Sequence, residues 1–471
     1  MSFFELVHDA PPIEVYALTE ACNEDKDTHK VNLGVGAYRT NEGKPWVLPV
    51  VRTVESLMAA DHNLDKEYLP VSGIDIMCKS ATKLVLGEDC KLIASKKADS
   101  CQTLGGTGAV YLALQFLSNI SKCTTVYISN PSWPNHKGIS LLVRLDIKEY
   151  CYWDPSSRKV NFTGMLEDLN KAPERAIVIL HACAHNPTGT DLSHDQWNQL
   201  ALLIKEKKLF PVFDMAYQGF ASGNLDNDAW AVRLFASMGM EMFIAQSFSK
   251  NFGLYNERVG NLIFITQDPV TTSHVKSQVK LLIRQTWSNP PQHGARIVAT
   301  ILNNISLFNE WKTCVITMAQ RIREMRQGLY ERLRSLGTPG NWEHIINQVG
   351  MFSYTGLTPT QTQYMKTKHH LYIMHDGRIN MCALTTNNID HIAQAIHDTE
   401  RLKKLTVGCI SSSSSLYRRR HHHHDTIFLS SVILRALSET TYIIIRIHHY
   451  TTTTNGRRPN SLKYWVETLL L

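Results

Sequence analysis

The sequence predicts an α/β fold in which a mostly parallel central sheet carries helices on both faces, together with a smaller α+β domain. Between about residues 100 and 265, short β-branched runs alternate with longer helical patterns. The short runs are apolar almost throughout, which is typical of parallel strands buried on both faces. The length of 471 residues is too great for one compact core and predicts roughly two or three domains.

The elements expected in the larger part follow in chain order. The strands are Thr125–Ser129, Ala176–His181, Leu209–Asp214, Met242–Gln246 and Gly260–Ile265. Helical patterns lie at Ala109–Leu117 and at Ser193–Lys207, and the second one opens with a residue sequence that resembles a capping box. Because such sheets bind ligands at the carboxyl ends of their strands, the residues that follow each strand are the candidates for a site.

The remaining elements predict a second, smaller domain. A long helical pattern from Ala295 to Leu336 contains few helix breakers, and its length suits a connector between two domains. Short strands are expected after it, followed by a closing helix at Asn388–Leu405. These strands are Met351–Tyr354, Leu371–Met374 and Ile379–Ala383. The expected boundaries are 1–46 for an N-terminal arm and part of the small domain, 47–309 for the large domain, and 310–406 for the small domain.

Residues 407–471 differ in composition from the rest, with runs of serine, arginine, histidine and threonine. We expect a disordered, low-complexity tail there. This segment holds eight Lys and Arg against three Asp and Glu, so it supplies +5 of the net charge of +7 and leaves +2 for residues 1–406. A body so nearly neutral gives no electrostatic case for binding nucleic acid or a membrane surface.

The cysteines and the N-terminus favour a cytoplasmic enzyme. Ten cysteines form no C-x-x-C pair, as expected of scattered, reduced thiols. The N-terminus lacks the features of a signal or transit peptide, and no apolar run reaches the ~18 residues of a membrane span.

Two charged residues at strand ends point to cofactor chemistry. Lys250 follows the strand Met242–Gln246, where its amine can be partly desolvated and form a Schiff base with a carbonyl compound. Asp214 ends another strand, and a semi-buried acid needs a cation such as a protonated pyridine nitrogen. Tyr217 can place a phenol near the ring oxygen. Taken singly, Lys250 also fits a solvated surface lysine, and Asp214 fits a turn or helix cap.

A glycine-rich turn at 105–109 predicts a phosphate site. Its backbone N–H groups can approach a phosphate at a helix N-terminus, and Thr107 adds a hydroxyl. A dinucleotide site is disfavoured, because Tyr111 occupies the third glycine position, no clear strand precedes the turn and no acid follows about 20 residues later. Arg258 offers a fork that suits phosphate, and Asn186 could donate to a ring oxygen.

These residues lie within longer stretches that resemble one family, the class I aminotransferases of fold type I, and among them the cytosolic aspartate aminotransferases. The resemblance runs from Ser2 to Leu405. Its most specific stretches are VNLGVGAYR (31–39), CAHNPTGTD (183–191), FDMAYQGFASG (213–223), QSFSKNFGLYNERVGNL (246–262), RQTWSNPPQHGARIV (284–298) and GRINMCALT (377–385).

The resemblance implies pyridoxal 5′-phosphate as cofactor and assigns it residue by residue. Lys250 would hold the cofactor as an aldimine and shuttle the proton, and Asp214 would pair with the pyridine nitrogen. Tyr217 and Asn186 would contact the ring oxygen, and Trp133 would stack on the ring. The catalytic residues would be Lys250, Asp214 and Tyr217. The phosphate would be held by Gly106, Thr107, Ser247, Ser249 and Arg258, with Tyr68 from the partner subunit of a homodimer.

For the substrate, the resemblance implies that Arg378 grips the α-carboxylate, with Gly36 nearby, and that Trp133 and Asn186 also contact it. Arg284, supplied across the dimer, would grip the side-chain carboxylate. Two such arginines favour dicarboxylates, because a neutral substrate would leave a buried cation unpaired.

The implied reaction is ping-pong transamination through the Lys250 aldimine, from L-aspartate and 2-oxoglutarate to oxaloacetate and L-glutamate. No metal is expected. An aromatic or broad-range aminotransferase, and a catalytically silent binding protein, are the alternatives. Gly105 departs from the serine of many cytosolic relatives, and we expect the backbone cradle to survive the change.

Overall fold

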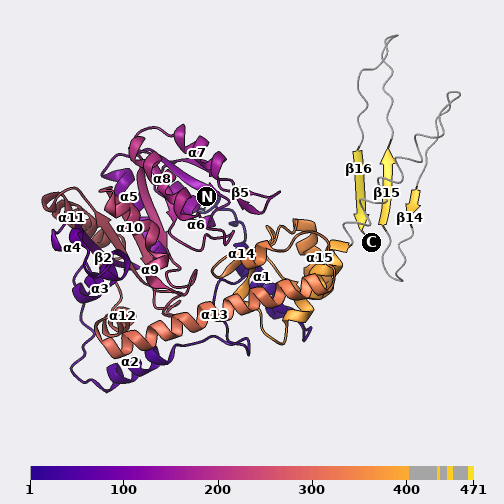
Figure 1. Ribbon diagram of the computed structural model, residues 1–471, viewed down its shortest axis with the longest axis horizontal. Coiled ribbons are helices and arrows are strands. Elements are labelled where there is room, and N and C mark those ends of the chain that lie inside the picture. The colour runs from indigo at the N-terminus through magenta and orange to yellow at the C-terminus, as the bar shows by residue number, and fades with distance from the viewer. Residues whose placement is uncertain (1, 402–431, 435–442, 449–464, 471) are drawn as a thin grey trace, which may run out of the picture. The chain divides into compact units, whose positions relative to one another are not determined.

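The computed structural model describes residues 2–401 and three short strands beyond them (Figure 1). The chain divides into two units, Met1–Lys403 and Lys404–Leu471. In the second unit, an antiparallel sheet is formed by β14 (Val432–Leu434), β15 (Ile443–His448) and β16 (Trp465–Leu470). The expectation of a disordered tail at 407–471 falls mostly outside the described residues.

A seven-stranded sheet organises the first unit, in the order β2-β10-β9-β8-β7-β3-β4. The strands are β2 (Ala98–Leu104), β3 (Thr125–Asn130), β4 (Asp146–Cys151), β7 (Ile177–His181), β8 (Phe210–Met215), β9 (Met242–Ser247) and β10 (Val259–Ile265). All five strands predicted for this part are present. The expectation of a mostly parallel sheet is confirmed, and β10 is the exception, since it runs antiparallel to β2 and β9. The segment between β9 and β10 holds no crossover helix, and parallel neighbours require one.

β2 and β4 were not expected, and β2 corrects one step of the sequence argument. It ends at Leu104, so a strand does precede the glycine-rich turn. β2 could not be recognised as a buried strand from its sequence, because several of its buried residues are polar and are satisfied by hydrogen bonds. Gln102 donates from Nε2 to the carbonyl of Pro291 at 2.7 Å, and the hydroxyl of Thr82 donates to the hydroxyl of Ser100 at 2.9 Å.

Helices cover both faces of the sheet, as predicted. Side chains of β7 alternate between two apolar clusters: Ile177 and Ile179 belong to the cluster that contains α5 (Gly105–Asn119) and α11 (Pro269–Thr286). Val178 and Leu180 belong to the cluster on the other face, with α8 (His194–Glu206) and α10 (Trp230–Ser237). The remaining elements of this part are α2 (Pro49–Ala60), α3 (Asp75–Leu86), α4 (Lys91–Ala94), α6 (Pro134–Leu142), α7 (Phe162–Asn170), α9 (Leu225–Asp228), β5 (Trp153–Asp154) and β6 (Lys159–Val160).

The long helical pattern is two helices rather than the single one expected. α12 (His293–Asn303) and α13 (Ile305–Ser335) are separated by Asn304. The Asn304 side chain accepts hydrogen bonds from the backbone N–H groups of Ser306 and Leu307, so it caps the second helix. α13 contacts α2, α12 and α14 (His344–Asn347), and in Figure 1 it crosses the lower part of this unit, above α2.

The smaller sheets join the N-terminal segment to the C-terminal part. β1 (Val31–Asn32) pairs with β12 (Leu371–Tyr372), and β11 (Phe352–Tyr354) with β13 (Arg378–Asn380). The three predicted strands end or begin at other residues than expected, and β11 begins at Phe352 rather than Met351. Residues 373–374 leave β12, and Met381–Ala383 forms a 3₁₀ turn, η1, because the Asn380 side chain accepts the N–H of Cys382 at 2.9 Å. Helices in this part are α1 (Glu14–Glu24), α15 (Pro359–His369) and residues 389–401.

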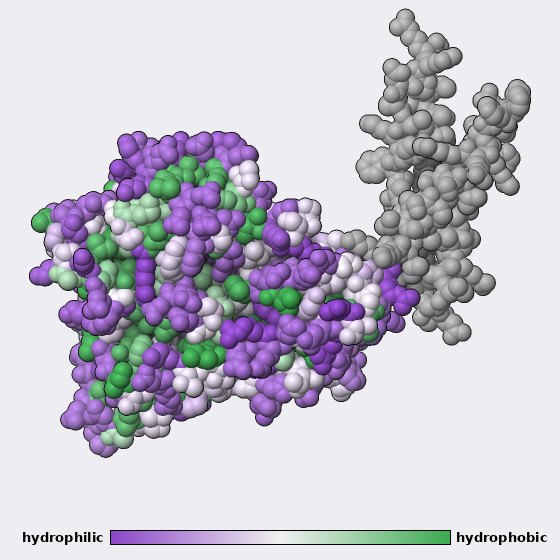
Figure 2. Space-filling model, viewed as in Figure 1, coloured by the Kyte–Doolittle hydropathy of each residue, from purple (hydrophilic) through white to green (hydrophobic). Residues whose placement is uncertain are grey.

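The surface in Figure 2 is mostly hydrophilic and shows smaller apolar areas between the polar ones. In residues 2–401 and the three later strands, no helix combines the length and apolar character needed to cross a bilayer. The nine cysteines within the described part are all free thiols, and seven of them are buried. None of these nine forms a disulfide, which agrees with the expectation of scattered, reduced thiols.

Candidate active site

A pocket of about 120 Å³ opens at the carboxyl ends of β7, β8 and β9, beside the N-terminus of α5. This is the edge at which parallel α/β sheets bind ligands. Every predicted cofactor-binding residue except Tyr68 lines it. The lining residues are Gly106, Thr107, Trp133, His181, Asn186, Asp214, Ala216, Tyr217, Ser247, Ser249, Lys250, Tyr255 and Arg258. A larger pocket of about 590 Å³ lies beside α13, but none of the predicted site residues lines it.

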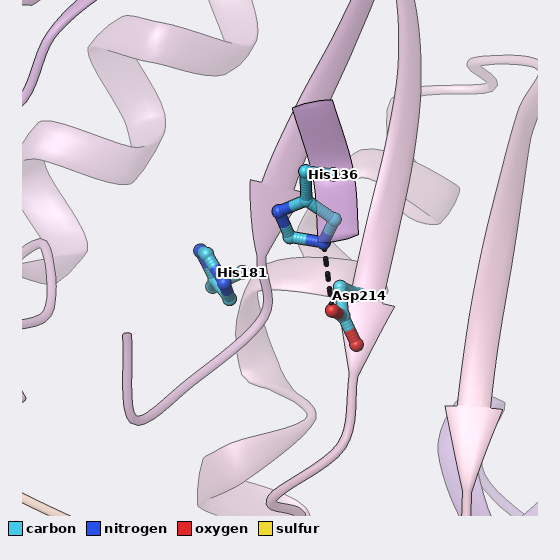
Figure 3. Close-up of side chains that lie close together, drawn as sticks. All are labelled: His136, His181 and Asp214. Carbon is cyan, nitrogen blue, oxygen red and sulfur yellow. Dashed lines mark hydrogen bonds and ion pairs between the residues drawn. The ribbon is translucent and has the colours of Figure 1, made fainter. Parts of the chain in front are cut away.

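Asp214 is held by a histidine from a neighbouring helix (Figure 3). Nε2 of His136 lies 2.9 Å from Oδ2 of Asp214, and Nδ1 of His136 lies 3.0 Å from the hydroxyl of Ser132. His181 lies beside them, with both ring nitrogens buried and without a hydrogen-bond partner in the described part of the chain. The three side chains offer donor atoms within 4.8 Å of one another. Since both nitrogens of His136 are engaged, we interpret the group as a support for Asp214 rather than a metal site.

The surroundings of Asp214 keep its carboxyl group ionised. Burial raises its pKa, but the hydrogen bond from His136 and the charges of His136, His181 and Lys250 outweigh burial and lower the pKa below its ordinary value. A buried carboxylate of this kind favours a cation against its free face. A protonated pyridine nitrogen meets that requirement.

Lys250 lies in the turn after β9, and this turn is fixed by neighbouring elements. Trp311 of α13 donates to the carbonyl of Asn251 at 2.8 Å, and the Asn251 amide donates to the carbonyl of Gln218 at 3.1 Å. Nζ of Lys250 lies 5.2 Å from the centre of the Tyr217 ring. Burial lowers the pKa of Lys250, with a contribution from the charges of Arg258 and Arg378, although Asp214 opposes the shift. A lysine with a lowered pKa is more often neutral and hence more nucleophilic toward a carbonyl.

The glycine-rich turn, two serines and an arginine form one polar cradle. A Cβ on Gly106 would lie 2.9 Å from the Cβ of Ser247, so a larger residue at 106 would close the gap between α5 and β9. The hydroxyls of Ser247 and Ser249 lie 3.2 Å apart, and Nη1 of Arg258 donates to Ser249 at 3.4 Å. Hydroxyls, a guanidinium and a helix N-terminus are the groups that bind a phosphate.

Gly105 has a structural role in this cradle. Its φ is +67°, and a Cβ there would lie 2.7 Å from Nη2 of Arg258. A serine at this position would therefore be strained and would press on the guanidinium. In this chain, Gly105 leaves the space that the Arg258 guanidinium occupies.

Arg378 lies at the start of β13 and is only 8% exposed. Nη1 donates to Oδ1 of Asn186 at 3.3 Å, and Nη2 donates to the carbonyl of Gly34 at 2.8 Å. Its Cζ lies 4.2 Å from the centre of the Phe352 ring. A Cβ on Gly36 would meet Phe352 at 2.8 Å, so this glycine lets the chain pass close to the same ring. The structure thus gathers Arg378, Asn186 and Gly36.

Tyr68 and Arg284 lie away from the pocket of their own chain. Tyr68 is 84% exposed and lines a separate pocket of about 410 Å³ with Ser288 and Asn289. Arg284 is exposed at the end of α11 and donates to the hydroxyl of Ser288. A single chain does not bring these two residues to the other predicted site residues.

The sequence reasoning missed two polar residues that line the pocket, His181 and Tyr255, and it missed His136, which lies outside the lining and contacts Asp214. His181 is the last residue of β7 and lies opposite Asp214 in the register, so the rule about strand ends could have found it. His136 follows Trp133 by three residues, in the first turn of α6. Tyr255 accepts the backbone N–H of Tyr38 at 2.9 Å, a contact between distant segments that leaves no local signal.

The donor set fits pyridoxal phosphate: a cradle for phosphate, an ionised carboxylate for the ring nitrogen and a buried lysine for the carbonyl group. Fold and site together define a pyridoxal-phosphate enzyme built on an α/β sheet. The profile of the family described as aminotransferase class I and II matches residues 28–396. The chain belongs to this family, whose members use pyridoxal phosphate.

The chain aligns with individual relatives over nearly the whole length of each relative. A cytoplasmic aspartate aminotransferase of Gallus gallus is 54% identical over 403 residues, which are 84% of this chain and 98% of the relative. The aspartate aminotransferase structure from the cytoplasm of Saccharomyces cerevisiae has a TM-score of 0.83 at 39% identity, covering 85% of this chain and 99% of that one. An aromatic-amino-acid aminotransferase of Burkholderia pseudomallei, covalently bound to pyridoxal phosphate, also has a TM-score of 0.83, at 42% identity, covering 85% of this chain and 100% of that one.

Proposed function

We propose that this chain is a cytoplasmic aspartate aminotransferase that converts L-aspartate and 2-oxoglutarate to oxaloacetate and L-glutamate by a ping-pong mechanism. The observation that carries the proposal is that a buried Lys250 and an ionised Asp214 line the same pocket. Arg378 donates a hydrogen bond to Asn186, which lines that pocket too. Relatives named for aspartate and for the cytoplasm support the substrate and the location.

The chain's own residues divide the work of holding the cofactor. Gly106, Thr107, Ser247, Ser249 and Arg258 would hold its phosphate. Asp214, supported by His136, would keep the ring nitrogen protonated. Tyr217 and Asn186 would contact the ring oxygen, and Trp133 would stack on the ring. Pyridoxal phosphate, when bound, supplies the electron sink for the carbanion that transamination requires.

Lys250 would act as the proton carrier. Its lowered pKa makes the amine more often neutral than that of an exposed lysine, so that the amine can take up the α-proton of the substrate. Arg378 would bind the α-carboxylate through a planar fork, with Gly36 leaving room for the substrate. These contacts orient the α-hydrogen relative to Nζ of Lys250.

We also propose a homodimer with shared active sites. Tyr68 lines a surface pocket together with Ser288, and Arg284 donates a hydrogen bond to Ser288. Both residues lie away from the candidate active site of their own chain. In the dimer, the partner would supply Tyr68 to the phosphate and Arg284 to the side-chain carboxylate. We propose domain boundaries at residues 47 and 310, with 1–46 shared between an arm and the small domain, which the β1–β12 pairing supports.

A coupled assay tests the reaction. The purified chain, loaded with pyridoxal phosphate, is given aspartate and 2-oxoglutarate, and oxaloacetate is measured by its reduction to malate. We expect turnover that needs both substrates. A loaded, folded protein that forms no oxaloacetate would overturn the proposal.

An aromatic aminotransferase is the second candidate, because the Burkholderia pseudomallei enzyme is as similar in fold as the yeast one. Arg284→Leu separates the two. If Arg284 grips a side-chain carboxylate, this variant should lose activity on aspartate by about 100-fold or more and change little on phenylalanine. Equal kcat/KM values for the two amino acids in the parent protein would favour the aromatic candidate.

A further inference from the structure

Two carboxylates lie close to Arg378 without pairing with it. Glu14 begins α1, and Asp376 precedes Arg378 by two residues. Glu14 accepts the backbone N–H of His375, three residues before Arg378. Leu18, one turn further along α1, would lie 3.4 Å from a Cβ on Gly34, whose carbonyl accepts Nη2 of Arg378. The charges of Asp376 and Glu14 also oppose the lowering of the pKa of Arg378 by burial. Yet no carboxylate oxygen of the described chain lies within 4.0 Å of a guanidinium nitrogen of Arg378.

Each carboxylate is occupied by another partner. Oδ1 of Asp376 accepts the backbone N–H of Arg378 at 3.0 Å. Glu14 is bound twice by His375: Oε1 accepts the backbone N–H at 2.5 Å, and Oε2 lies 2.6 Å from Nδ1 of the ring. His375 is 69% exposed, and the Glu14 side chain is about half as exposed. His375 therefore holds Glu14 at the edge of the site.

The guanidinium of Arg378 is left with neutral partners. Its two bonds run to the carbonyl of Gly34 and the amide oxygen of Asn186, and its Nε is buried with no partner among the described residues. An arginine that is already paired with a carboxylate of its own chain would have to break that pair before it binds another. Arg378 has no such pair to break.

We propose that His375 is a positioning residue for substrate binding, whose ring holds Oε2 of Glu14 so that Arg378 stays open to the substrate carboxylate. The inference rests on the role proposed above for Arg378. When the His375 ring is absent, Oε1 of Glu14 keeps its bond to the backbone N–H of residue 375, but Oε2 loses its partner and can compete with the substrate for Arg378. The effect then belongs to binding, and the chemical step on the far side of the pocket is unchanged.

Four variants of the full-length, cofactor-loaded protein test this: His375→Gln, Glu14→Gln, the double variant, and His29→Gln as a control. His29 is an exposed histidine that also lies beside an aspartate, Asp27. Two quantities are measured: the Kd of succinate, a dicarboxylate that cannot be transaminated, by calorimetry, and the KM and kcat for aspartate. Succinate binding does not depend on turnover, so failure of the proposed function and failure of this inference are distinguishable.

For His375→Gln we expect the Kd of succinate and the KM of aspartate to rise about two- to fivefold, with kcat within about twofold of the parent. Glu14→Gln and His29→Gln should leave both quantities within about twofold. The double variant should return to the parent values, because the competing charge is gone. Salt at about 0.5 M should reduce the defect of His375→Gln.

Two results would overturn the proposal. The first is a His375→Gln variant that binds succinate as tightly as the parent. The second is a double variant as weak as His375→Gln, since this would show that the histidine acts through local structure and not through the charge of Glu14.

Discussion

At the scale of single residues, the burial of Lys250 decides what the site can do. The same residue type on the surface would be a hydrated cation, whereas here burial lowers its pKa and Asp214 lies across the pocket. Asp214 in turn depends on His136, because burial alone would raise its pKa and favour the neutral acid. The properties of Lys250 and Asp214 thus depend on two elements, α6, which carries His136, and the turn after β9, which carries Lys250.

Replacement of the lysine gives the sharpest prediction at this scale. Lys250→Ala should lower the turnover of aspartate by about 10⁴-fold or more, because both the covalent attachment and the proton carrier are lost. Lys276→Ala is the matched control: Lys276 is a partly buried lysine paired with Asp99 at 2.8 Å, away from the pocket. Steady-state assays of both variants check this. A Lys250→Ala protein with a tenth of the parental turnover would contradict it.

At the scale of elements, helix ends carry local stability. Ser193 accepts the N–H of Gln196 at 3.2 Å, and Gln196 accepts the N–H of Ser193 at 2.9 Å, which is a complete capping box. Ser193→Ala should lower the free energy of unfolding by about 1 kcal/mol. Ser237→Ala, at the end of α10 and outside any N-cap, should cost less. Thermal unfolding of the two variants decides, and equal shifts would contradict the capping role.

The contact between α14 and the β5–β6 hairpin predicts a pH dependence. Burial lowers the pKa of His344 to about 3, and the charges of Arg158 and Arg326 act in the same direction. The unfolded chain, with an ordinary histidine pKa of about 6.5, binds more protons between about pH 6.5 and pH 3, so stability is complete above that range and falls as the pH drops through it.

The His344→Gln variant lacks this contribution of His344 to the pH dependence of stability. Between pH 7 and pH 5 the parent should lose about 1–2 kcal/mol more of its free energy of unfolding than the variant does. Denaturation curves at the two pH values measure the difference, and the exposed His62→Gln serves as the control. Parallel losses in parent and His344→Gln proteins would show that His344 is not buried as a neutral ring.

Most elements were predictable because their apolar residues are continuous or periodic, as in β7 and α8. β2 was not, because its buried polar residues are satisfied by distant partners such as Pro291. The break at Asn304 was hidden, since asparagine interrupts a helical pattern weakly but caps the next helix well. In the site, strand ends marked Lys250 and Asp214, whereas the support by His136 comes from packing between elements and has no local signature.

At the scale of the whole molecule, the exposed positions of Tyr68 and Arg284 matter most. Neither lies at the pocket of its own chain, and the proposed dimer explains why. Two inactive variants, Lys250→Ala and Arg284→Leu, should then complement each other. In a mixed dimer one site combines the intact lysine of one chain with the intact arginine of the other.

Co-expression of the two variants tests this. Randomly mixed chains should recover about a quarter of the parental activity on aspartate, because half of the dimers are mixed and each holds one intact site. The two variants carry different affinity tags, and purification on both tags in turn shows whether mixed dimers form. Mixed dimers without activity would contradict the sharing of Arg284 between subunits.

The half-reaction tests the central claim most directly. The loaded protein is mixed with aspartate in the absence of 2-oxoglutarate, and the oxaloacetate released is counted against the number of chains. The account predicts a burst of about one oxaloacetate per chain that then stops and resumes on addition of 2-oxoglutarate, since the enzyme retains the amino group between the two halves. No release of oxaloacetate, or continuous release without 2-oxoglutarate, would contradict it.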